Sequence, residues 1–330
     1  MTERSAMTDV EQSESLELRL EQYRGELTGY CYRMLGSAAE AEDAVQDAMI
    51  RAWRGHDGFE GRSSLRSWLY RIATNVCLDA LRSRKARARP MDLAGPSTVA
   101  TAALTVLPEV TWIGPLPDAR IAAADGDPAE VAAQRDSVRL ALIAALQRLP
   151  ARQRAVLILR EVLDWRAGEV AELLDTTVAS VNSALQRARA TLSAQEVADT
   201  DPVRPLDPEQ AALLTRYVQA FERYDMDALA ELLHQDAVMS MPPYALWLRG
   251  RPEIRAWMTG PGAECQGSRL LPTVANGAPA FGQYRPDPDG GHRPWALQVL
   301  DLSGGRVTGF TFFLDTDTLF PMFGLPARLD

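Results

Sequence analysis

The sequence predicts a protein of several domains, in which two all-helical domains are followed by an α+β domain. Three observations support this fold class. The length of 330 residues exceeds that of one ordinary domain. Residues 147–192 carry the pattern of a helix-turn-helix. A proline-bearing segment at 196–208 then separates this helical part from a segment with rising glycine and aromatic content, in which we expect helices over 209–235 and strands at 237–241, 295–302 and 307–314.

The helix-turn-helix pattern places a polar face opposite an apolar stripe. Residues 166–174 are predicted as a short helix, and 175–177 as a polar turn that favours a helix start. The next helix buries residues spaced by three and four, namely Val178, Val181, Leu185, Ala188 and Leu192. Its other face carries Ser180, Asn182, Ser183, Gln186, Arg187 and Arg189. Such side chains can contact base edges and phosphates in a major groove, although an ordinary helical hairpin with a solvated face has the same pattern.

Three further helices are predicted near the N-terminus, over residues 16–35, 38–54 and 64–84. Ser37 and Glu40 form a capping-box pattern at the start of the second helix. In the third helix the apolar residues Leu65, Trp68, Leu69, Ile72 and Val76 form a core face. A polar stripe of the same helix consists of Arg71, Asn75, Asp79 and Arg82. Asparagine can read an adenine edge and arginine can hold phosphates, so this stripe is a second candidate for contact with nucleic acid.

The charge of the chain is unevenly distributed. The net charge is −9, yet residues 62–89 hold eight basic residues, Arg84 and Lys85 among them, against the single acid Asp79. An acidic protein with one strongly basic strip is expected to bind a polyanion at that place only.

The second predicted helix carries a cluster of polar residues on one side. Asp43, Gln46 and Asp47 lie three and four positions apart, and we expect them to have no cationic partner on their own helix. The cluster could be a metal site, a docking surface for a basic partner, or a solvated face, and the solvated face is the simplest interpretation. Because no histidine and no second helix of carboxylates accompanies it, we expect no metal and no cofactor.

The cysteine content and the hydropathy of the chain indicate its cellular compartment. Cys31, Cys77 and Cys265 are widely separated and odd in number, which fits a reducing compartment and neither a disulfide framework nor a metal site. The first 15 residues are polar and acidic rather than a signal peptide, and no apolar run approaches the roughly 20 residues that span a bilayer. We therefore expect a cytoplasmic protein.

Three motifs occur in a recognisable order: AEDAVQDAMIRAWR, GFEGRSSLRSWLYRIATNVCLDALRSR and LPARQRAVLILREVLDWRAGEVAELLDTTVASVNSALQRARATL. With them, residues 16–195 resemble an extracytoplasmic-function, or group four, sigma factor of the sigma-70 family. The resemblance implies region two over 16–89, a linker over 90–128 and the helix-turn-helix of region four over 129–195. The motif TWIGPLPDA at 111–119 resembles a subgroup that also carries a C-terminal extension.

The resemblance also implies roles for the candidate residues. Asp43, Gln46 and Asp47 fall in the helix that contacts the clamp of RNA polymerase. Asn75 matches the position that captures a flipped base of the minus-ten promoter element, with Arg71, Asp79, Arg82, Arg84 and Lys85 on the same surface. The exposed face at Ser180, Asn182, Ser183, Gln186, Arg187 and Arg189 would read the minus-thirty-five element. The implied partners are core RNA polymerase and promoter DNA, and the sequence leaves open whether an anti-sigma partner exists.

After a second linker at 196–208, residues 209–326 resemble a SnoaL-like domain of the nuclear-transport-factor-two-like cone fold, through QAFERYDMDALAELLHQDAVMSMPP and LWLRGRPEIRAWM. In that fold a curved sheet and helices enclose an apolar cavity. The residues that could line a pocket for a small molecule are Tyr217, Phe221, Met239, Trp247, Trp257, Trp295 and Phe312. His234 and Asp236 are the only nearby candidates for a general base, and capping or solvation explains them more simply, so we expect no enzyme.

We therefore expect a sigma factor that directs core polymerase to specific promoters and is regulated in cis by its C-terminal domain. Two other interpretations stay open. A one-component regulator would bind duplex DNA through its helix-turn-helix without polymerase, and its cone domain would bind an effector. An enzyme of the polyketide-cyclase or isomerase kind, fused to a DNA-binding segment, would show turnover in residues 201–330 alone.

Overall fold

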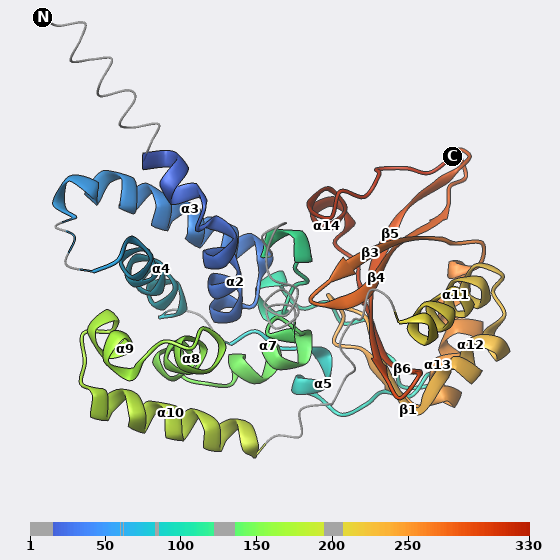
Figure 1. The fold of residues 1–330 in the computed structure, drawn as a ribbon. Coiled ribbons are helices and arrows are strands. Elements are labelled where there is room, and N and C mark those ends of the chain that lie inside the picture. Colours follow the sequence, from blue (N-terminus) through green and yellow to red (C-terminus); the bar gives the residue numbers. More distant parts are fainter. Residues whose placement is uncertain (1–15, 60, 62, 83–85, 122–135, 195–206) are drawn as a thin grey trace, which may run out of the picture. The chain divides into compact units, whose positions relative to one another are not determined.

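The computed structural model describes residues 16–59, 61, 63–82, 86–121, 136–194 and 207–330 (Figure 1). The chain divides into two compact units. Met1–Ala86 and Ala119–Glu196 form the first, which we call the helical unit, and Arg87–Asp118 and Val197–Asp330 form the second, which we call the cone unit. The predicted fold class, helical domains followed by an α+β domain, is confirmed.

The helical unit contains two groups of helices, one from each part of the chain. The first group is α2 (Arg24–Leu35), α3 (Ala38–Gly55), η1 (His56–Gly58) and α4 (Leu65–Leu81). The second group is α7 (Leu140–Gln147), α8 (Ala151–Leu157), η4 (Ile158–Val162), α9 (Ala167–Leu173) and α10 (Val178–Ser193). The single helix predicted over 16–35 is wrong at Gln22 and Tyr23, which form a turn, because the Tyr23 amide bonds the Leu20 carbonyl at 3.0 Å and so closes a tighter turn.

Local capping explains where these helices begin and end. The Ser37 hydroxyl accepts a hydrogen bond from the Glu40 amide at 3.4 Å and starts α3, as the capping pattern predicts. Ser64 caps α4 in the same way by accepting from the Ser67 amide at 3.1 Å. Gly36, with φ of 73°, ends α2 in the left-handed conformation that a glycine adopts most readily. The expected core face of α4 is only partly confirmed, since Leu69 and Val76 are buried whereas Leu65, Trp68 and Ile72 are half-buried.

The cone unit is built on a six-stranded sheet, and helices from several parts of the chain pack on that sheet (Figure 1). Its elements are α11 (Pro208–Glu222), α12 (Met226–Leu232), β1 (Leu233–Ser240), β2 (Trp247–Arg249), α13 (Arg251–Thr259), η5 (Pro261–Cys265), β3 (Arg269–Ala275), β4 (Ala278–Pro286), β5 (His292–Ser303), β6 (Arg306–Phe313) and α14 (Thr316–Met322). The strand order is β2-β1-β6-β5-β4-β3, with β1 and β6 parallel and the other pairs antiparallel.

The strands predicted at 237–241, 295–302 and 307–314 correspond to β1, β5 and β6, and the strand expected before Gly250 in LWLRGRPEIRAWM is β2, whereas β3 and β4 were not predicted. The two missed strands form a hairpin that turns at Asn276 and Gly277, both with positive φ. Asn-Gly is the dipeptide that such a two-residue turn favours, so the local signal was present. Apolar residues of the helices and of the sheet form one core between them, with Phe221, Leu229, Ile254, Leu300 and Phe310 among its members.

Residues 87–118, which we call the strap, contact the rest of the cone unit at several places. They hold α5 (Pro90–Leu93), η2 (Glu109–Thr111) and the start of η3 (Asp118–Arg120). The Ser97 amide bonds the Trp247 carbonyl at 2.8 Å, and the Leu107 amide bonds the Pro243 carbonyl at 3.0 Å. The segment expected to be a linker over 90–128 is therefore, up to Asp118, an ordered part of the cone unit. Its residues 122–128, and the second linker up to residue 206, lie outside the described residues.

Candidate nucleic-acid interface

The predicted polar face of the helix-turn-helix lies in solvent on α10. Thr177 caps the helix by accepting a hydrogen bond from the Ser180 amide at 3.1 Å, after a turn in which Asp175 has a positive φ of 48°. Arg189 forms an ion pair of 2.5 Å with Glu161 of η4. All six predicted residues are exposed, namely Ser180, Asn182, Ser183, Gln186, Arg187 and Arg189.

The apolar side of α10 packs on α8 and α9. Val181, Leu185 and Ala188 are buried as predicted. The prediction was wrong for Val178, which is 46% exposed because it begins the helix next to an exposed turn. This helix therefore has a buried side that holds it in place and a free side that can enter a groove.

The stripe on α4 is only partly free. Asn75 and Asp79 are exposed, and Asp79 pairs with Arg82 at 3.0 Å on the same helix. Arg71 reaches the second group of helices, where it donates to the Glu172 carbonyl of α9 at 3.5 Å and lies 3.8 Å from its carboxylate. Arg84 and Lys85 lie outside the described residues.

The acidic face of α3 is also in solvent. Asp43 and Gln46 are exposed, and Asp47 is half-buried. The expectation that these residues have no cationic partner on their helix was wrong for Asp47, which forms an ion pair of 2.7 Å with Arg51. Arg51 lies four positions further on, the spacing at which helical side chains meet.

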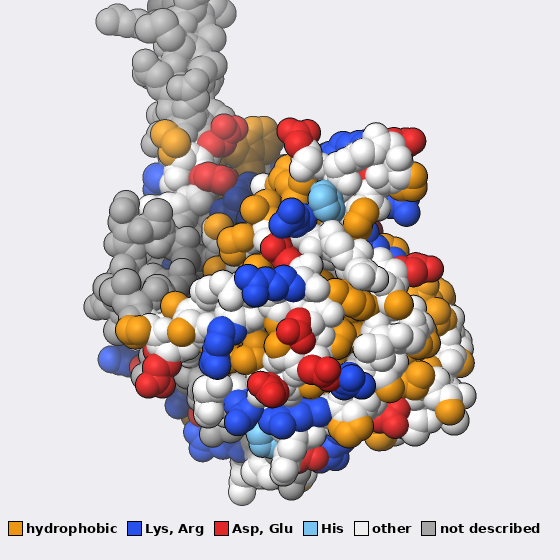
Figure 2. Space-filling view, turned by 90° about the vertical axis from the view of Figure 1, so that its right-hand side faces the viewer, with side chains coloured by type: hydrophobic (Ala, Val, Ile, Leu, Met, Phe, Trp, Pro, Cys, Tyr) orange, Lys and Arg blue, Asp and Glu red, His pale blue; other side chains and the backbone are white. Residues whose placement is uncertain are grey.

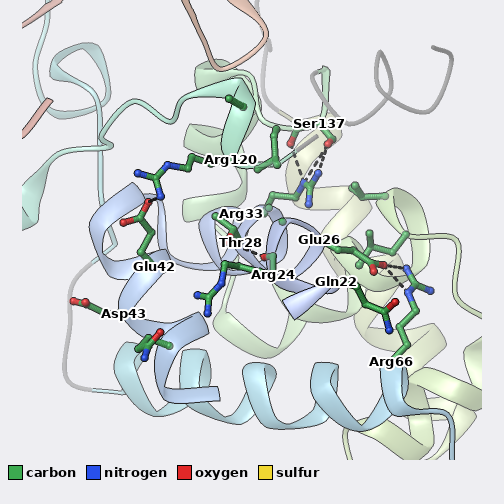
Figure 3. Close-up of a pocket in the computed structure, with 17 residues that line it drawn as sticks. Gln22, Arg24, Glu26, Thr28, Arg33, Glu42, Asp43, Arg66, Arg120 and Ser137 are labelled. Carbon is green, nitrogen blue, oxygen red and sulfur yellow. Dashed lines mark hydrogen bonds and ion pairs between the residues drawn. The ribbon is translucent and has the colours of Figure 1, made fainter. Parts of the chain in front are cut away.

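Asp43 and Gln46 stand at the edge of a hollow of about 950 Å³ in the helical unit. Figure 3 shows that charged side chains of α2 line this hollow, and that Arg120 pairs with Glu42 at 3.0 Å. The Asp43 carboxylate points away from that pair.

Buried arginines join the two groups of helices. The Arg33 guanidinium of α2 donates to the Ser137 hydroxyl and, at 3.3 Å, to its carbonyl. The Arg154 guanidinium of α8 donates to the Met34 carbonyl at the end of α2 and to the Gln147 side chain at 2.7 Å. Desolvation by burial lowers the pKa of both arginines to about 10. Each cation thus satisfies main-chain carbonyls that would otherwise be buried without a donor.

An aromatic cluster continues this contact. Tyr70 of α4 packs between Tyr30 and Trp165, with ring centroids 5.1 and 5.0 Å apart. Arg66 lies over Tyr70 and Trp165 and also pairs with Glu26. The predictions from the sequence did not include Arg33, Arg154 or Trp165, and Arg66 was predicted only as part of the basic strip at 62–89. A single arginine within an apolar run, as in YCYRML, is the signal that could have indicated Arg33.

The predicted pocket residues of the cone unit fall into three groups. Met239, Trp257, Trp295 and Phe312 line a cavity of about 100 Å³. Tyr217 and Phe221 pack in the core of the unit, where the Tyr217 hydroxyl donates to Gln298 at 2.8 Å. Trp247 faces the strap, and its indole N–H donates to the Ala94 carbonyl at 2.8 Å.

The two candidate bases of the cone unit lie at its surface. His234 and Asp236 are on β1, and the Asp236 amide donates to the His234 ring at 3.2 Å. Asp236 is exposed and pairs with Arg249 at 3.4 Å, so solvent and a surface arginine already satisfy its carboxylate. Among the residues that the structure describes, no group of His, Cys, Asp or Glu side chains is placed to hold a metal ion. No described helix is long and apolar enough to cross a membrane.

A helix-turn-helix with a free polar face, a second helical part with a polar stripe and a cone-shaped third domain define a class, the sigma-70 factors with an appended SnoaL-like domain. Family models agree with this class. Sigma-70 region 2 matches residues 20–87, Sigma-70 region 4 matches 139–192, and the SnoaL-like domain matches 214–310.

Proteins of similar sequence assign the chain to a particular family within this class. The ECF RNA polymerase sigma factor SigG of Mycobacterium tuberculosis is 46% identical over 312 residues, which cover 94% of this chain and 83% of the relative. This chain therefore belongs to the ECF RNA polymerase sigma factors. SigW of Bacillus subtilis is 30% identical over 177 residues, 52% of this chain and 84% of its own. The crystal structure of SigJ from M. tuberculosis shares the fold, with a TM-score of 0.59 at 22% identity over 93% of this chain and 99% of that one.

The expected function is thereby confirmed: the protein is an RNA polymerase sigma factor, with core polymerase and promoter DNA as its partners. The interpretation as a one-component regulator is not favoured, because it does not explain region two.

Proposed function

We propose that this sigma factor engages its promoter only after the helical unit opens, and that the cone unit regulates this opening in cis through the strap. The observation that carries the proposal is the way in which the strap closes on itself. The Ala88 amide donates to the Thr111 carbonyl at 2.8 Å, and the Ile113 amide donates to the Ala88 carbonyl at 3.1 Å. Arg87 adds a hydrogen bond of 2.6 Å to the Trp112 carbonyl. The two ends of the strap thus lie together.

The geometry of a promoter requires region two and region four to separate. The minus-ten and minus-thirty-five elements are about 25 base pairs apart, which is roughly 85 Å of duplex at about 3.4 Å per base pair. In the helical unit, α4 and α9 are in direct contact through Arg71 and Glu172. One packed unit cannot reach both elements, and the same contact occupies an arginine of the proposed minus-ten surface.

The strap limits how far the two regions can separate. About 24 residues between its paired ends would extend to roughly 80 Å if they were released. While hydrogen bonds keep these residues on the cone unit, they do not lengthen the connection between region two and region four. The end of the strap that leads to region four is also bound to the cone unit. The Leu116 amide donates to the Asn276 side chain at 2.8 Å, and Asp118 accepts from the Gly277 amide at 2.8 Å.

Contacts of the strap support this mechanism better than surface charge does. Residues 201–330 carry 16 acids and 11 basic residues, and this surplus could cover the basic strip at 62–89. Several of these acids already have arginine partners, among them Asp227, Asp236, Glu222 and Glu264. On the face of the cone unit in Figure 2, acidic and basic side chains are interspersed, which weakens a purely electrostatic attraction.

We assign the exposed faces to the two partners as follows. Asp43, Gln46 and Asp47 of α3 bind core polymerase. Asn75, with Arg71, Asp79, Arg82, Arg84 and Lys85, contacts the minus-ten element. The minus-thirty-five element is read by Ser180, Asn182, Ser183, Gln186, Arg187 and Arg189. The cone unit acts as a binding domain without turnover, and the protein works in the cytoplasm with RNA polymerase.

Releasing the strap in the full-length protein tests the proposal. Asn276→Gly with Asp118→Ala removes two side chains that hold the strap, and glycine keeps the positive φ of 56° at position 276. We expect run-off transcription with core polymerase to rise several-fold. Asp289→Ala, an exposed change in the same unit, is the control. Transcription equal to or below that of the wild-type protein would contradict inhibition through the strap.

The minus-ten assignment has its own test. Asn75→Ala should reduce permanganate reactivity of the minus-ten region, because a flipped base loses its hydrogen-bonding partner. Binding of the upstream element through α10 should stay unchanged. Equal losses at both elements would indicate a folding defect rather than a role in strand opening.

A further inference from the structure

The cone unit contains a cavity that has no role in the proposed function. We propose that this cavity binds a short-chain aliphatic carboxylate, of about the size of butyrate, and that Arg285 holds its carboxylate group. The inference rests on the proposed function only for the step that connects binding to the strap.

The cavity is apolar apart from one cation. Its wall is formed largely by methionine and aromatic side chains, namely Met239, Met241, Trp257, Met258, Trp295 and Phe312. The charged member of the lining is Arg285 of β4. Thioether side chains are flexible and adapt to a ligand of variable shape. An apolar pocket with a few polar groups at one end is the usual form of a small-molecule site.

Arg285 is incompletely satisfied by its surroundings. Its side chain is 11% exposed, and its Nε is buried without a hydrogen-bond partner among the described residues. Its two other nitrogens bond Glu264 at 3.1 Å and the Cys265 sulfur at 3.1 Å. Glu264 is 81% exposed, so its carboxylate shares its charge with solvent. A buried guanidinium with a free donor favours an anion beside it.

The guanidinium is also held in one orientation. Its central carbon lies 3.2 Å from the centroid of the Trp295 ring, which covers one face of the group. Because the orientation of the guanidinium is fixed, a carboxylate can bind beside its free Nε without a further loss of side-chain freedom.

The size of the cavity limits the apolar part of the ligand. A cavity of about 150 Å³ holds benzene, so the 100 Å³ here leaves room for only a short aliphatic chain. A carboxylate with about three carbons beyond the carboxyl group fits these dimensions.

One wall of the cavity belongs to the strap. Leu104 lines the cavity and is 53% exposed, and its neighbour Thr105 accepts a hydrogen bond from the Ala245 amide at 3.1 Å. Val106 pairs with Tyr244, which also lines the cavity. A ligand would therefore contact the segment that joins region two to region four, and would fix it more firmly on the cone unit.

Titration of the full-length protein with sodium butyrate tests the site, with butyramide as the uncharged probe of similar shape. Trp257 and Trp295 line the cavity and report occupancy through their fluorescence. We expect a saturable change with butyrate and at least about a tenfold weaker response with butyramide. An equal response to the two probes, or none to butyrate, would overturn the proposal.

Substitutions of Arg285 and of a matched control arginine test which cation binds the carboxylate. Arg285→Met should weaken butyrate binding at least about tenfold, whereas Arg293→Met, its exposed partner on β5, should leave it unchanged. Should Arg285→Met fail to fold by circular dichroism, Arg285→Lys keeps the charge without the fork, and binding several-fold weaker than wild type is expected. Wild-type affinity in the folded variant would overturn the role of Arg285.

Hydrogen exchange tests whether ligand binding at this site affects the strap, independently of the transcription test. Bound butyrate should slow amide exchange in residues 97–107 of the strap. If butyrate binds but exchange there is unchanged, the connection to the strap is overturned while the site stands. The transcription test of the strap contains no butyrate, so its failure would contradict the proposed regulation alone.

Discussion

The contacts inside the helical unit differ in kind from those inside the cone unit. In the helical unit, region two meets region four through Arg33 and Arg154, which donate to Ser137 and to the Met34 carbonyl. In the cone unit, Phe310 and its apolar neighbours join the sheet to its helices. Burial of the two arginines has a desolvation cost that lowers each pKa to about 10, and separation in water removes this cost.

This difference suggests which part of the molecule can change shape. Water can replace the hydrogen bonds of the arginines when the two regions separate, and the apolar contact that is then lost includes the rings of Tyr70 and Trp165. The cone unit cannot open in this way, because opening would expose its apolar core to water. We therefore expect region two and region four to move as bodies, and the cone unit to stay closed and hold the strap.

The largest effect should follow from damage to the core of the cone unit. Phe310→Ala creates a cavity between the sheet and its helices and should lower the free energy of unfolding by about 3–5 kcal/mol. Thermal unfolding should show this loss in the cone unit and an unchanged transition of the helical unit. Val274→Ala, at a site already 38% exposed, is the control and should have little effect. A matching loss in both units would show that they unfold as one body.

Charge reversal on α3 should have the next largest effect. Asp43→Lys with Asp47→Lys places two cations where we expect a basic partner, and should weaken binding to core polymerase on the order of 100-fold. A pull-down or a titration with core polymerase measures this. Glu231→Lys, an exposed reversal in the cone unit, is the control and should bind normally. Unchanged affinity of the double variant would exclude this face as the clamp contact.

A change at the contact between the regions tests whether the helical unit opens. Trp165→Ala removes the ring that packs on Tyr70 and should shift the equilibrium toward the open form by about 2–3 kcal/mol. Small-angle scattering should show a larger radius, while circular dichroism stays unchanged. Trp53→Ala, at a ring 51% exposed, should leave the radius as it is. Loss of helix content in the Trp165 variant would mean that this contact belongs to one indivisible core.

The smallest effect concerns readout of the upstream element. Arg187→Ala on the exposed face of α10 should weaken binding to the minus-thirty-five element by about 1–3 kcal/mol if the arginine reads a base. Duplexes with the native and with a scrambled element separate the two possible roles. An equal loss on both would make Arg187 a phosphate contact. Arg216→Ala, a surface arginine of α11, serves as the matched control.

Local signals in the sequence predicted much of the helical unit. The Ser37 cap and the α10 stripe at Val181, Leu185 and Ala188 are confirmed. The failures are also local: the turn at Gln22 and Tyr23 lacks a glycine or proline, and Val178 has the right spacing but begins the helix beside an exposed turn. In the cone unit the Asn276–Gly277 dipeptide is typical of a tight hairpin turn, although strands β3 and β4 were not predicted.

The sequence by itself determined the order of the domains, the caps of their helices and the polar faces of α3, α4 and α10. These features depend on residues three or four positions apart, which a periodic pattern records. Only the tertiary structure decided that Arg154 closes the end of α2, that the strap lies on the cone unit, and that Arg285 stands beside Trp295 in the cavity. Contacts such as Arg33 with Ser137 join residues 104 positions apart, and such pairs leave no periodic trace in the chain. Their partners follow from how whole elements pack, and packing is set by shape and burial across the entire unit.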